Sequence, residues 1–403
     1  MSRPNQFLSP EGDIEDYFVD EYWLIDQWVG DQLWVWGAAS RLSGNGALGN
    51  GATTGNISTP ITTFAGGTNW KQVDGGLVQT AAIKTDGTLW TWGYNVQGQL
   101  GNAQVTNRST PVTTFAGGTN WKQVSCGDTH TAAIKTDGTL WTWGLTNDGR
   151  LGNGITTLGT RSTPITTFVG GNNWKQVSCG SGNTSAIKTD GTLWTWGIGT
   201  NGRLGNGITT GNISTPITTF AGGTNWKQVS TGRFHTAAIK TDGTLWIWGQ
   251  GTVGQLGNAQ IINISTPITT FSGGTNWKQV NCGELHTAAI KTDGTLWIWG
   301  SGDNGQLGNA QIINISTPIT TFSGGTNWKQ VSGGSGHAAA IKTNGTLWTW
   351  GLGNYGRLGN AQTTNVSTPV TTFAGGTNWK QVSGGNVHTA AVEAGINAEY
   401  PLS

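Results

Sequence analysis

A segment of about 50 residues is repeated seven times in this chain of 403 residues. Each copy carries two tryptophan signatures, N-W-K-Q-V and W-x-W-G, and successive copies of either signature lie mostly 51 to 53 residues apart. A fixed period of this length indicates one supersecondary unit that is copied and packed against its neighbours. The tryptophans of the first signature are Trp70, Trp121, Trp174, Trp226, Trp277, Trp328 and Trp379, and the glycines that end the second are Gly37, Gly93, Gly144, Gly197, Gly249, Gly300 and Gly351.

The repeated unit reads as four short strands. In the copy at residues 119–170, strands are predicted at Lys122–Cys126, His130–Lys135, Leu140–Trp143 and Pro164–Phe168, with a T-D-G-T hairpin between the second and the third. A composition with 67 glycines and only 10% charged residues suits strands and tight turns. Four antiparallel strands copied seven times predict an all-β, seven-bladed β-propeller.

The two tryptophans of W-x-W-G account for how blades would pack. Trp141 and Trp143 are two residues apart on one strand, so they project to the same face. That face is expected to pack on the next blade, and each ring would bury roughly 150–250 Å².

The two ends of the chain complement each other. The first repeat element, Leu33–Gly37, is a third strand that no first or second strand precedes. The last copy runs from Lys380 to Val392 and then lacks both the T-D-G hairpin and W-x-W-G. The sequence therefore predicts a composite blade, two strands from each end, which closes the ring and removes free sheet edges.

At this point the sequence resembles the RCC1 (regulator of chromosome condensation) family. The match consists of G-x-x-H-T-A-A-I-K-T-D-G-T-L-W-T-W-G, as in Gly127–Gly144, followed by G-Q-L-G-N, as in Gly98–Asn102. The resemblance implies the propeller fold over about 370 residues. It implies less about function, because this propeller serves exchange factors, chromatin binders, secreted inhibitors and phage or bacterial proteins. The near-identical copies look most like RCC1-like proteins encoded by aquatic bacteriophages.

No residue pattern indicates catalysis, and we expect a non-enzymatic protein. One repeat position is histidine in five copies and Gln79 or Asn183 in the others, which favours a repeated hydrogen bond that holds a turn. The three cysteines occupy one position in three different copies and are expected to be buried, free thiols. Neither a cofactor nor a metal site is predicted. The histidines are His130, His235, His286, His337 and His388, and the cysteines are Cys126, Cys179 and Cys282.

The lysine of N-W-K-Q-V is present in all seven copies and allows two interpretations. If its strand lies nearest the axis, as in the family, seven lysines could ring one mouth of the channel and attract anions. The alternative, which we favour, is that their stems cover tryptophan faces while the ammonium groups stay solvated. The set comprises Lys71, Lys122, Lys175, Lys227, Lys278, Lys329 and Lys380.

The copies differ in two connections and agree in the other two. The turn between the first and second strands and the loop after W-x-W-G vary, whereas T-D-G-T and A-G-G-T-N-W barely change. In an up-and-down blade the two variable connections lie on one face, and loops on a rigid scaffold are where binding usually resides. Simple drift of surface loops is the alternative. The predicted binding residues are Leu77, Val78, Tyr94, Asp128, Leu145, Arg233, Phe234, Glu284, Leu285, Asp303, Tyr355 and Asn386.

Residues 1–31 lie outside the repeat and form a predicted acidic, aromatic N-terminal arm before the propeller of residues 32–403. The arm holds eight acidic residues and one arginine, a net charge of −7, while the remainder of the chain carries +8. Its apolar residues fall roughly on a helical stripe that must be buried somewhere. We expect the arm to dock on another protein, through Tyr17, Phe18, Tyr22, Trp23 and Trp28.

The sequence thus predicts a binding or structural module. The resemblance to phage proteins implies a virion appendage, assembled in the host cytoplasm, whose arm attaches to the particle and whose variable face contacts a ligand or host surface. The alternative is a soluble, cytoplasmic regulator of the exchange-factor or inhibitor type that binds proteins. The family's exchange factors carry a protruding β-wedge, and no copy here has an insertion that would supply one. No nucleic-acid partner is expected, and no run of 18 apolar residues could span a membrane.

Overall fold

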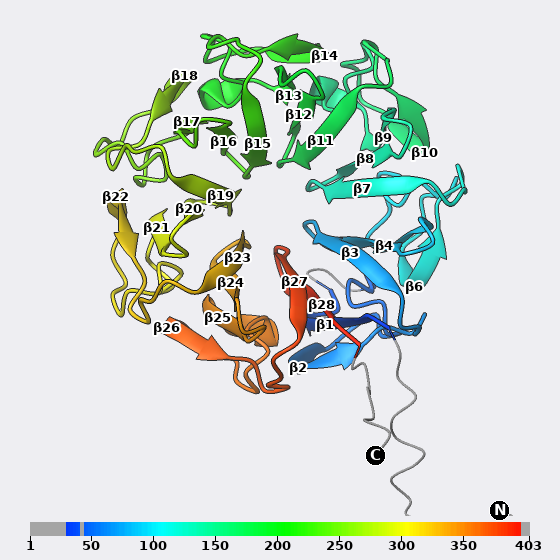
Figure 1. Ribbon diagram of the computed structural model, residues 1–403. Coiled ribbons are helices and arrows are strands. Elements are labelled where there is room, and N and C mark those ends of the chain that lie inside the picture. The colour runs from blue at the N-terminus through cyan, green and yellow to red at the C-terminus, as the bar shows by residue number, and fades with distance from the viewer. Residues whose placement is uncertain (1–29, 41–43, 396–403) are drawn as a thin grey trace, which may run out of the picture.

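A computed structural model describes residues 30–40 and 44–395. These residues form seven four-stranded antiparallel sheets, arranged as blades around a central axis (Figure 1). In every blade but the closing one, the four strands follow each other in chain order, and the first strands of neighbouring blades contact each other around the axis. The predicted seven-bladed propeller is confirmed.

Six blades are continuous in sequence. Their strands are β3 (Trp70–Gly75), β4 (Gln79–Lys84), β5 (Leu89–Gly93) and β6 (Arg108–Thr113); β7 (Trp121–Cys126), β8 (His130–Lys135), β9 (Leu140–Leu145) and β10 (Thr160–Thr166); β11 (Trp174–Cys179), β12 (Asn183–Lys188), β13 (Leu193–Ile198) and β14 (Asn212–Thr218); β15 (Trp226–Thr231), β16 (His235–Lys240), β17 (Leu245–Gly249) and β18 (Ile264–Thr269); β19 (Trp277–Cys282), β20 (His286–Lys291), β21 (Leu296–Gly300) and β22 (Ile315–Thr320); β23 (Trp328–Gly333), β24 (His337–Lys342), β25 (Leu347–Gly351) and β26 (Val366–Thr371). Within residues 30–40 and 44–395, the helical structure consists of three single turns, η2 (Asn147–Gly149), η3 (Thr200–Gly202) and η4 (Asn354–Gly356).

The closing blade combines both ends of the chain, as predicted. Its strand order is β2 (Asn56–Thr62), β1 (Gln32–Ala38), β28 (His388–Glu393) and β27 (Trp379–Gly384). The pairing of β1 with β28 sets Leu33 opposite Val392 and Trp36 opposite Thr389. In Figure 1 the blue and red ends of the colour scale meet in this one blade.

The fourth strand of each blade begins and ends earlier than the sequence predicts. In the copy described above it is Thr160–Thr166, not Pro164–Phe168. The Phe168 amide leaves the ladder because it donates to the carbonyl of Gly152, 2.8 Å away, in the preceding loop. This bond turns the chain out of the sheet and points it toward the next blade.

The tryptophans fill the seams between blades, but toward the preceding blade in the chain, not the next one as we expected. Trp143 is fully buried, and its Nε1 donates to the Gln99 carbonyl of the preceding blade at 2.9 Å. It packs with Trp121 of its own blade against Ala81 and Ile83 of the preceding one. The direction in which the tryptophans point follows from side-chain size. One face of each sheet carries alanines and isoleucines, which are smaller than tryptophan, and the tryptophan rings on the facing sheet fill the space that they leave.

The glutamine of N-W-K-Q-V closes the ring of first strands. Gln123 donates through Nε2 to the carbonyl of Val177 in the next blade, and its Oε1 accepts from the amide of the same valine, both at 3.0 Å. One amide side chain thus satisfies a backbone donor and a backbone acceptor that no strand would otherwise pair. The same pair of hydrogen bonds recurs at every seam, through Gln72, Gln123, Gln176, Gln228, Gln279, Gln330 and Gln381.

Candidate functional site

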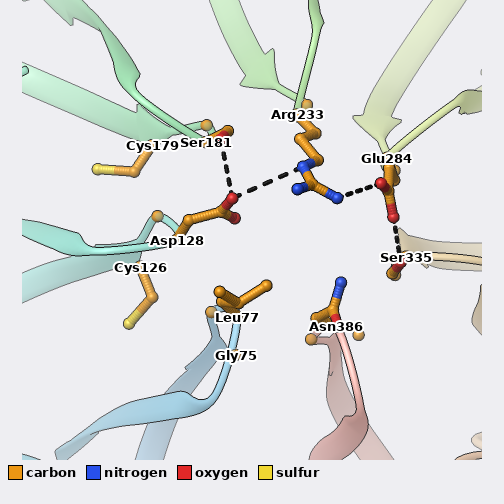
Figure 2. A pocket seen from close by; sticks show the side chains of 18 of the residues that line it. Gly75, Leu77, Cys126, Asp128, Cys179, Ser181, Arg233, Glu284, Ser335 and Asn386 are labelled. Carbon is orange, nitrogen blue, oxygen red and sulfur yellow. Dashed lines mark hydrogen bonds and ion pairs between the residues drawn. The ribbon is translucent and has the colours of Figure 1, made fainter. Parts of the chain in front are cut away.

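The turns between first and second strands meet at one end of the axis. Each turn begins with small residues, and the residue that follows them differs between blades. Together the seven turns line a hollow of about 100 Å³. Figure 2 shows these side chains pointing toward one another across the mouth. In blade order the varying residues are Leu77, Asp128, Ser181, Arg233, Glu284, Ser335 and Asn386.

Arg233 is the centre of a charged network that spans five blades. Its guanidinium lies 3.6 Å from the Asp128 carboxylate on one side and pairs with Glu284 on the other. Ser181 donates to Asp128 at 2.8 Å, and Ser335 donates to Glu284. The Arg233 side chain keeps 31% of its surface exposed, so the network is partly solvated and can exchange its bonds for those of a ligand.

A second hollow, of about 230 Å³, adjoins the mouth. Arg233, Glu284 and Asn386 line it from the mouth side, while Tyr355 and Arg357 line it from the loop after W-x-W-G. Ser335, Leu352, Asn354 and Val387 complete its wall. The Arg357 guanidinium lies 5.4 Å from the centre of the Tyr355 ring. Tyr355 has a φ of +64°, a left-handed conformation that is rare for an aromatic residue, so the scaffold holds this ring at some energetic cost.

The structure brings together six of the predicted binding residues, at the mouth or at the second hollow beside it. Leu77, Asp128, Arg233, Glu284 and Asn386 share the mouth, and Tyr355 joins three of them at the second hollow. Val78, by contrast, is only 4% exposed, because it packs with Ala38 and Val387 in a small cluster that Tyr94 partly covers. It therefore cannot belong to an open surface. Phe234 lies against the guanidinium groups of Arg203 and Arg233, and Leu145, Leu285 and Asp303 line neither hollow.

Arginines of the G-x-L-G-N motif are site residues that the sequence analysis did not select. The motif carries arginine in three copies and glutamine in three others. Arg357 donates to the Asn386 carbonyl at 2.5 Å, and Arg203 donates to the Arg233 carbonyl at 3.2 Å, so each holds the mouth turn of the next blade. The alternation of arginine and glutamine in an otherwise constant motif was the available signal.

The histidines link blades below these turns. Nε2 of His130 lies 2.9 Å from Oγ1 of Thr184 in the next blade. The threonine hydroxyl donates to the Arg150 carbonyl at 3.0 Å, so Nε2 of the imidazole must be the donor in the bond to the threonine. The bond crosses a seam and does not merely hold a turn, which corrects our expectation. Burial lowers the pKa of His130 to about 3 and leaves the ring without a role as a base at neutral pH.

One of the five histidines lacks this bond. His286 faces Ala338 where the other copies have threonine, and its Nε2 has no partner among the described residues. Burial also lowers the pKa of His286, to about 4. Gln79 takes the slot in its own blade by donating to the Gly127 carbonyl at 2.6 Å. The slot thus tolerates substitution and a missing bond, as a structural position would.

The three cysteines are buried free thiols, as expected. Burial raises the pKa of Cys179 and that of Cys282 to about 12 each, so both stay protonated and unreactive. Asp74 stands where most other blades have serine. Its carboxylate accepts from the Cys126 amide at 2.7 Å and from Ser383, and desolvation raises its pKa to about 6.

The lysines of N-W-K-Q-V are exposed at the far ends of the first strands, away from the mouth. They do not cover the tryptophans, as we had favoured. That role belongs to the lysine of I-K-T-D-G: Lys84 lies directly across the ladder from Trp70, and its Nζ is 4.9 Å from the centres of the Trp70 and Trp90 rings. Within a strand, neighbouring residues point to opposite faces, so Lys71 cannot reach the ring of Trp70 beside it.

The described residues show neither a metal-binding cluster nor a membrane-spanning helix. They contain no group of three or more His, Cys, Asp or Glu side chains placed to hold a metal ion. None of their helices is long and apolar enough to cross a membrane. The predicted docking residues Tyr17, Phe18, Tyr22, Trp23 and Trp28 lie outside the described part of the chain.

Fold and site together define a class: a closed seven-bladed propeller with one nearly constant face and one face of differing side chains. Comparison with protein families makes the assignment specific. The RCC1-like domain model matches residues 159–397, and the model of the RCC1 repeat matches residues 86–134. The chain belongs to the RCC1 family.

Its relatives include receptors and ligases. The chain is 31% identical over 325 residues to the ultraviolet-B receptor UVR8 of Arabidopsis thaliana, which covers 79% of this chain and 74% of the receptor. It is 28% identical to the E3 ubiquitin-protein ligase HERC2 of Homo sapiens, where the match spans 79% of this chain but only 7% of the ligase. These relatives are plant and human proteins, and they give no support to the expected closeness to bacteriophage proteins.

Solved structures agree on the fold. Human WBSCR16 superposes with a TM-score of 0.80 at 20% identity, covering 91% of this chain and all of that one. Yeast RCC1 (Prp20), solved with Kap60 bound, gives a TM-score of 0.77 at 20% identity and covers 92% of this chain and 90% of that one. At this level of identity the likeness shows the fold alone.

Proposed function

We propose that this protein is a non-enzymatic, protein-binding regulator of the RCC1 type, and that its variable face holds the partner. One observation carries the proposal: the varying turns of all seven blades meet at one hollow, which a second hollow adjoins, whereas the opposite connections repeat. Drift alone would scatter differences over both faces, since both are exposed.

The chemistry of the hollows fits a protein ligand. Arg233 and Glu284 offer opposite charges side by side, and Tyr355 and Leu352 add apolar surface beside them. Arginine and tyrosine are the side chains that most often dominate protein interfaces. Because every turn is fixed to a rigid blade, such a site would lose little conformational entropy on binding.

The relatives favour a regulator over a virion appendage. A solved yeast relative, Prp20p, is described by its binding to Gsp1p and histones, and another structure of it contains Kap60. We carry over only the class of partner, a protein, and not these partners themselves. The virion role and its location stay predictions that none of the relatives supports.

Site-specific photocrosslinking tests the proposal. We would place p-benzoylphenylalanine at position 355 of the full chain, expose it to an extract of the source cells, and irradiate. The account predicts adducts with one or a few discrete proteins. The matched control is the same residue at position 373, an exposed phenylalanine of the same blade on the opposite face. Equal adducts at both positions, or none at position 355 across growth conditions, would contradict a binding role for the variable face.

A further inference from the structure

Every lysine of this protein lies on the face opposite the mouth. Seven belong to N-W-K-Q-V at the start of the first strands, and six to I-K-T-D-G at the end of the second strands. The acidic groups among them are the five hairpin aspartates and Glu393, which leaves this lysine face at about +7 before Asp31 is counted. The described arginines, in contrast, lie on the mouth side. The I-K-T-D-G set comprises Lys84, Lys135, Lys188, Lys240, Lys291 and Lys342.

The lysine face also exposes seven phenylalanines. One ring follows the last strand of each blade, at the start of the connection to the next blade, and each is between 70% and 74% exposed. Single exposed apolar residues are ordinary, but a large aromatic left in water at every repeat marks a surface that something covers. The rings are Phe64, Phe115, Phe168, Phe220, Phe271, Phe322 and Phe373.

The chain enters the propeller from this same face. The carbonyl of Asp31 accepts from the Trp70 amide at 3.0 Å, as the hairpin glycine Gly87 does for Trp121, so Asp31 takes the place of a hairpin in the closing blade. Its carboxylate binds Nζ of Lys380 at 2.7 Å. The last acidic residue of the N-terminal arm is therefore already paired with a lysine of N-W-K-Q-V.

A hollow lies beside this entry point. Its volume is about 130 Å³, and Leu33, Thr68 and Trp70 are among the residues that line it. It opens where the connection that follows Phe64 passes the start of β1. The entry point thus offers a paired lysine, a small recess of mixed polar and apolar lining and an exposed aromatic ring within one blade.

We propose that the lysine face is the docking surface for residues 1–29 of the same chain. The segment carries seven acidic residues against Arg3, and it carries five aromatic residues between positions 17 and 28, besides Phe7. Acidic side chains complement the lysines, and aromatic ones complement the exposed phenylalanines. Twenty-nine residues reach up to about 95 Å when extended, enough to cross several blades.

Tethering decides which copy of the segment binds. A segment joined directly to its docking surface has an effective concentration on the order of millimolar, far above the concentration of other copies in dilute solution. The segment therefore covers its own lysine face and leaves the mouth of the variable face open. This inference does not depend on what the variable face binds.

Zero-length coupling of carboxylates to amines tests the proposal in the full chain. A carbodiimide activates an Asp or Glu side chain, a lysine amine displaces the activated group, and an amide remains after net loss of water. Because all native lysines share one face, the test variant also carries Arg161→Lys, which places an amine on an exposed strand position of the mouth side. We expect acidic residues 11–26 to couple to native lysines at least tenfold more than to position 161, and the coupling to fall in high salt.

An equal mixture of unlabelled and ¹⁵N-labelled chains separates the outcomes. Links within one isotope class support docking on the same chain. Mixed links at the statistical proportion would show that the segment binds a second copy and would overturn the proposal. Coupling to position 161 as strong as to the native lysines would overturn it as well, because the segment would then have no preferred face.

Matched surface variants then identify the contacts. Lys71→Glu and Phe64→Ser, both close to the entry point, should each lower the yield of links from residues 11–26 by about threefold or more. Arg161→Glu and Leu158→Ser make the same changes at exposed positions on the mouth side, where Leu158 is 81% exposed, and should leave the yield unchanged. Equal effects of test and control variants would contradict a specific surface.

Discussion

The two faces of this propeller differ in what the repeat has kept constant. The mouth face carries the described arginines, two hollows and turns whose side chains change from blade to blade, while the lysine face repeats the same lysines, aspartates and phenylalanines. Both faces are built by the same four strands. The repeat therefore fixes the scaffold and one surface, and it leaves only the mouth free to specify a partner.

The difference also separates two kinds of charged contact. On the mouth face, arginines with planar guanidinium groups hold backbone carbonyls of neighbouring turns and thereby shape the hollows. On the lysine face, flexible ammonium groups stay exposed or lie over tryptophan rings. A shaped site suits one partner, whereas a spread of mobile charges suits an acidic segment.

The largest effect should come from the scaffold that both faces share. Trp143→Ala removes a fully buried ring from a seam, and we expect it to lower the free energy of unfolding by about 3–5 kcal/mol. Trp141→Ala, at the partly buried position two residues earlier, should cost clearly less. Urea unfolding followed by circular dichroism measures both. Equal losses would contradict the assignment of Trp143 as the seam residue.

Acid should weaken the seams beneath the mouth. A histidine whose folded pKa lies below 6.5 binds its proton more readily in the unfolded chain, so its stabilising contribution is complete above pH 6.5 and is lost as the pH falls toward 3 to 4. Each such histidine costs about 1.4 kcal/mol per pH unit in that window. Asp74 acts oppositely: with a folded pKa of about 6 it adds stability as the pH falls from 6 to 3.8.

Unfolding in urea between pH 7 and pH 4.5 measures this dependence. His130→Gln, which copies the Gln79 arrangement, should reduce the slope of stability against pH by about one proton and change stability little at pH 7. A slope that is unchanged in this variant would show that His130 is not titrating on unfolding.

A missing seam bond can be restored. Ala338→Thr should supply the hydroxyl that His286 lacks and raise the free energy of unfolding by about 1 kcal/mol, the usual net worth of one hydrogen bond. Thr389→Ala, which removes the same partner from His337, is the reciprocal control and should lose at least as much. If Ala338→Thr destabilises the protein, the pocket around His286 has closed over the missing group.

The smallest effect concerns the ring that the mouth face holds in a left-handed backbone. Asn201 and Asp148 occupy the same repeat position as Tyr355 with a φ of +63°, and both residue types tolerate it. Tyr355→Asn should therefore gain about 0.5 kcal/mol, a relief of about 1 less the cation–π contact with Arg357. Asn201→Tyr should lose about 1 kcal/mol. A stability loss in Tyr355→Asn would show that the tyrosine is kept for packing and not for binding.

Most of the fold could be predicted from the sequence because the same pattern of strands and turns occurs in seven copies. The strand starting at His130, the D-G hairpins and the pairing of Leu33–Gly37 with the last strand all follow from local pattern and copy number. The direction in which the tryptophans point could not be predicted in this way, since it depends on which sheet face of the neighbouring blade carries the smaller side chains. The glutamine bonds across seams were equally invisible, because a partner about 50 residues away leaves no local signature.

The site could be predicted only by its face. Variation located the mouth and selected Arg233, Glu284 and Asn386, but it also selected Val78, whose side chain turns inward. Arg357 was not predicted as a binding residue, because it stands in a motif that otherwise repeats. Variation reports which positions are free to change, while the direction of a side chain is set by packing that one sequence does not display.

The most direct test exchanges one mouth turn for another that the fold already contains. Arg233→Ser together with Phe234→Gly turns that connection into the Ser181-Gly182 version, which the preceding blade of the same chain already contains. The measurement is quantitative mass spectrometry of proteins retained by the full chain, with Lys227→Ser of the same blade as the control. If the variable face is the binding face, the turn exchange removes the retained partners at an unchanged melting temperature and Lys227→Ser keeps them. Retention of the same partners by the turn-exchanged chain, or their loss only with Lys227→Ser, would contradict the account.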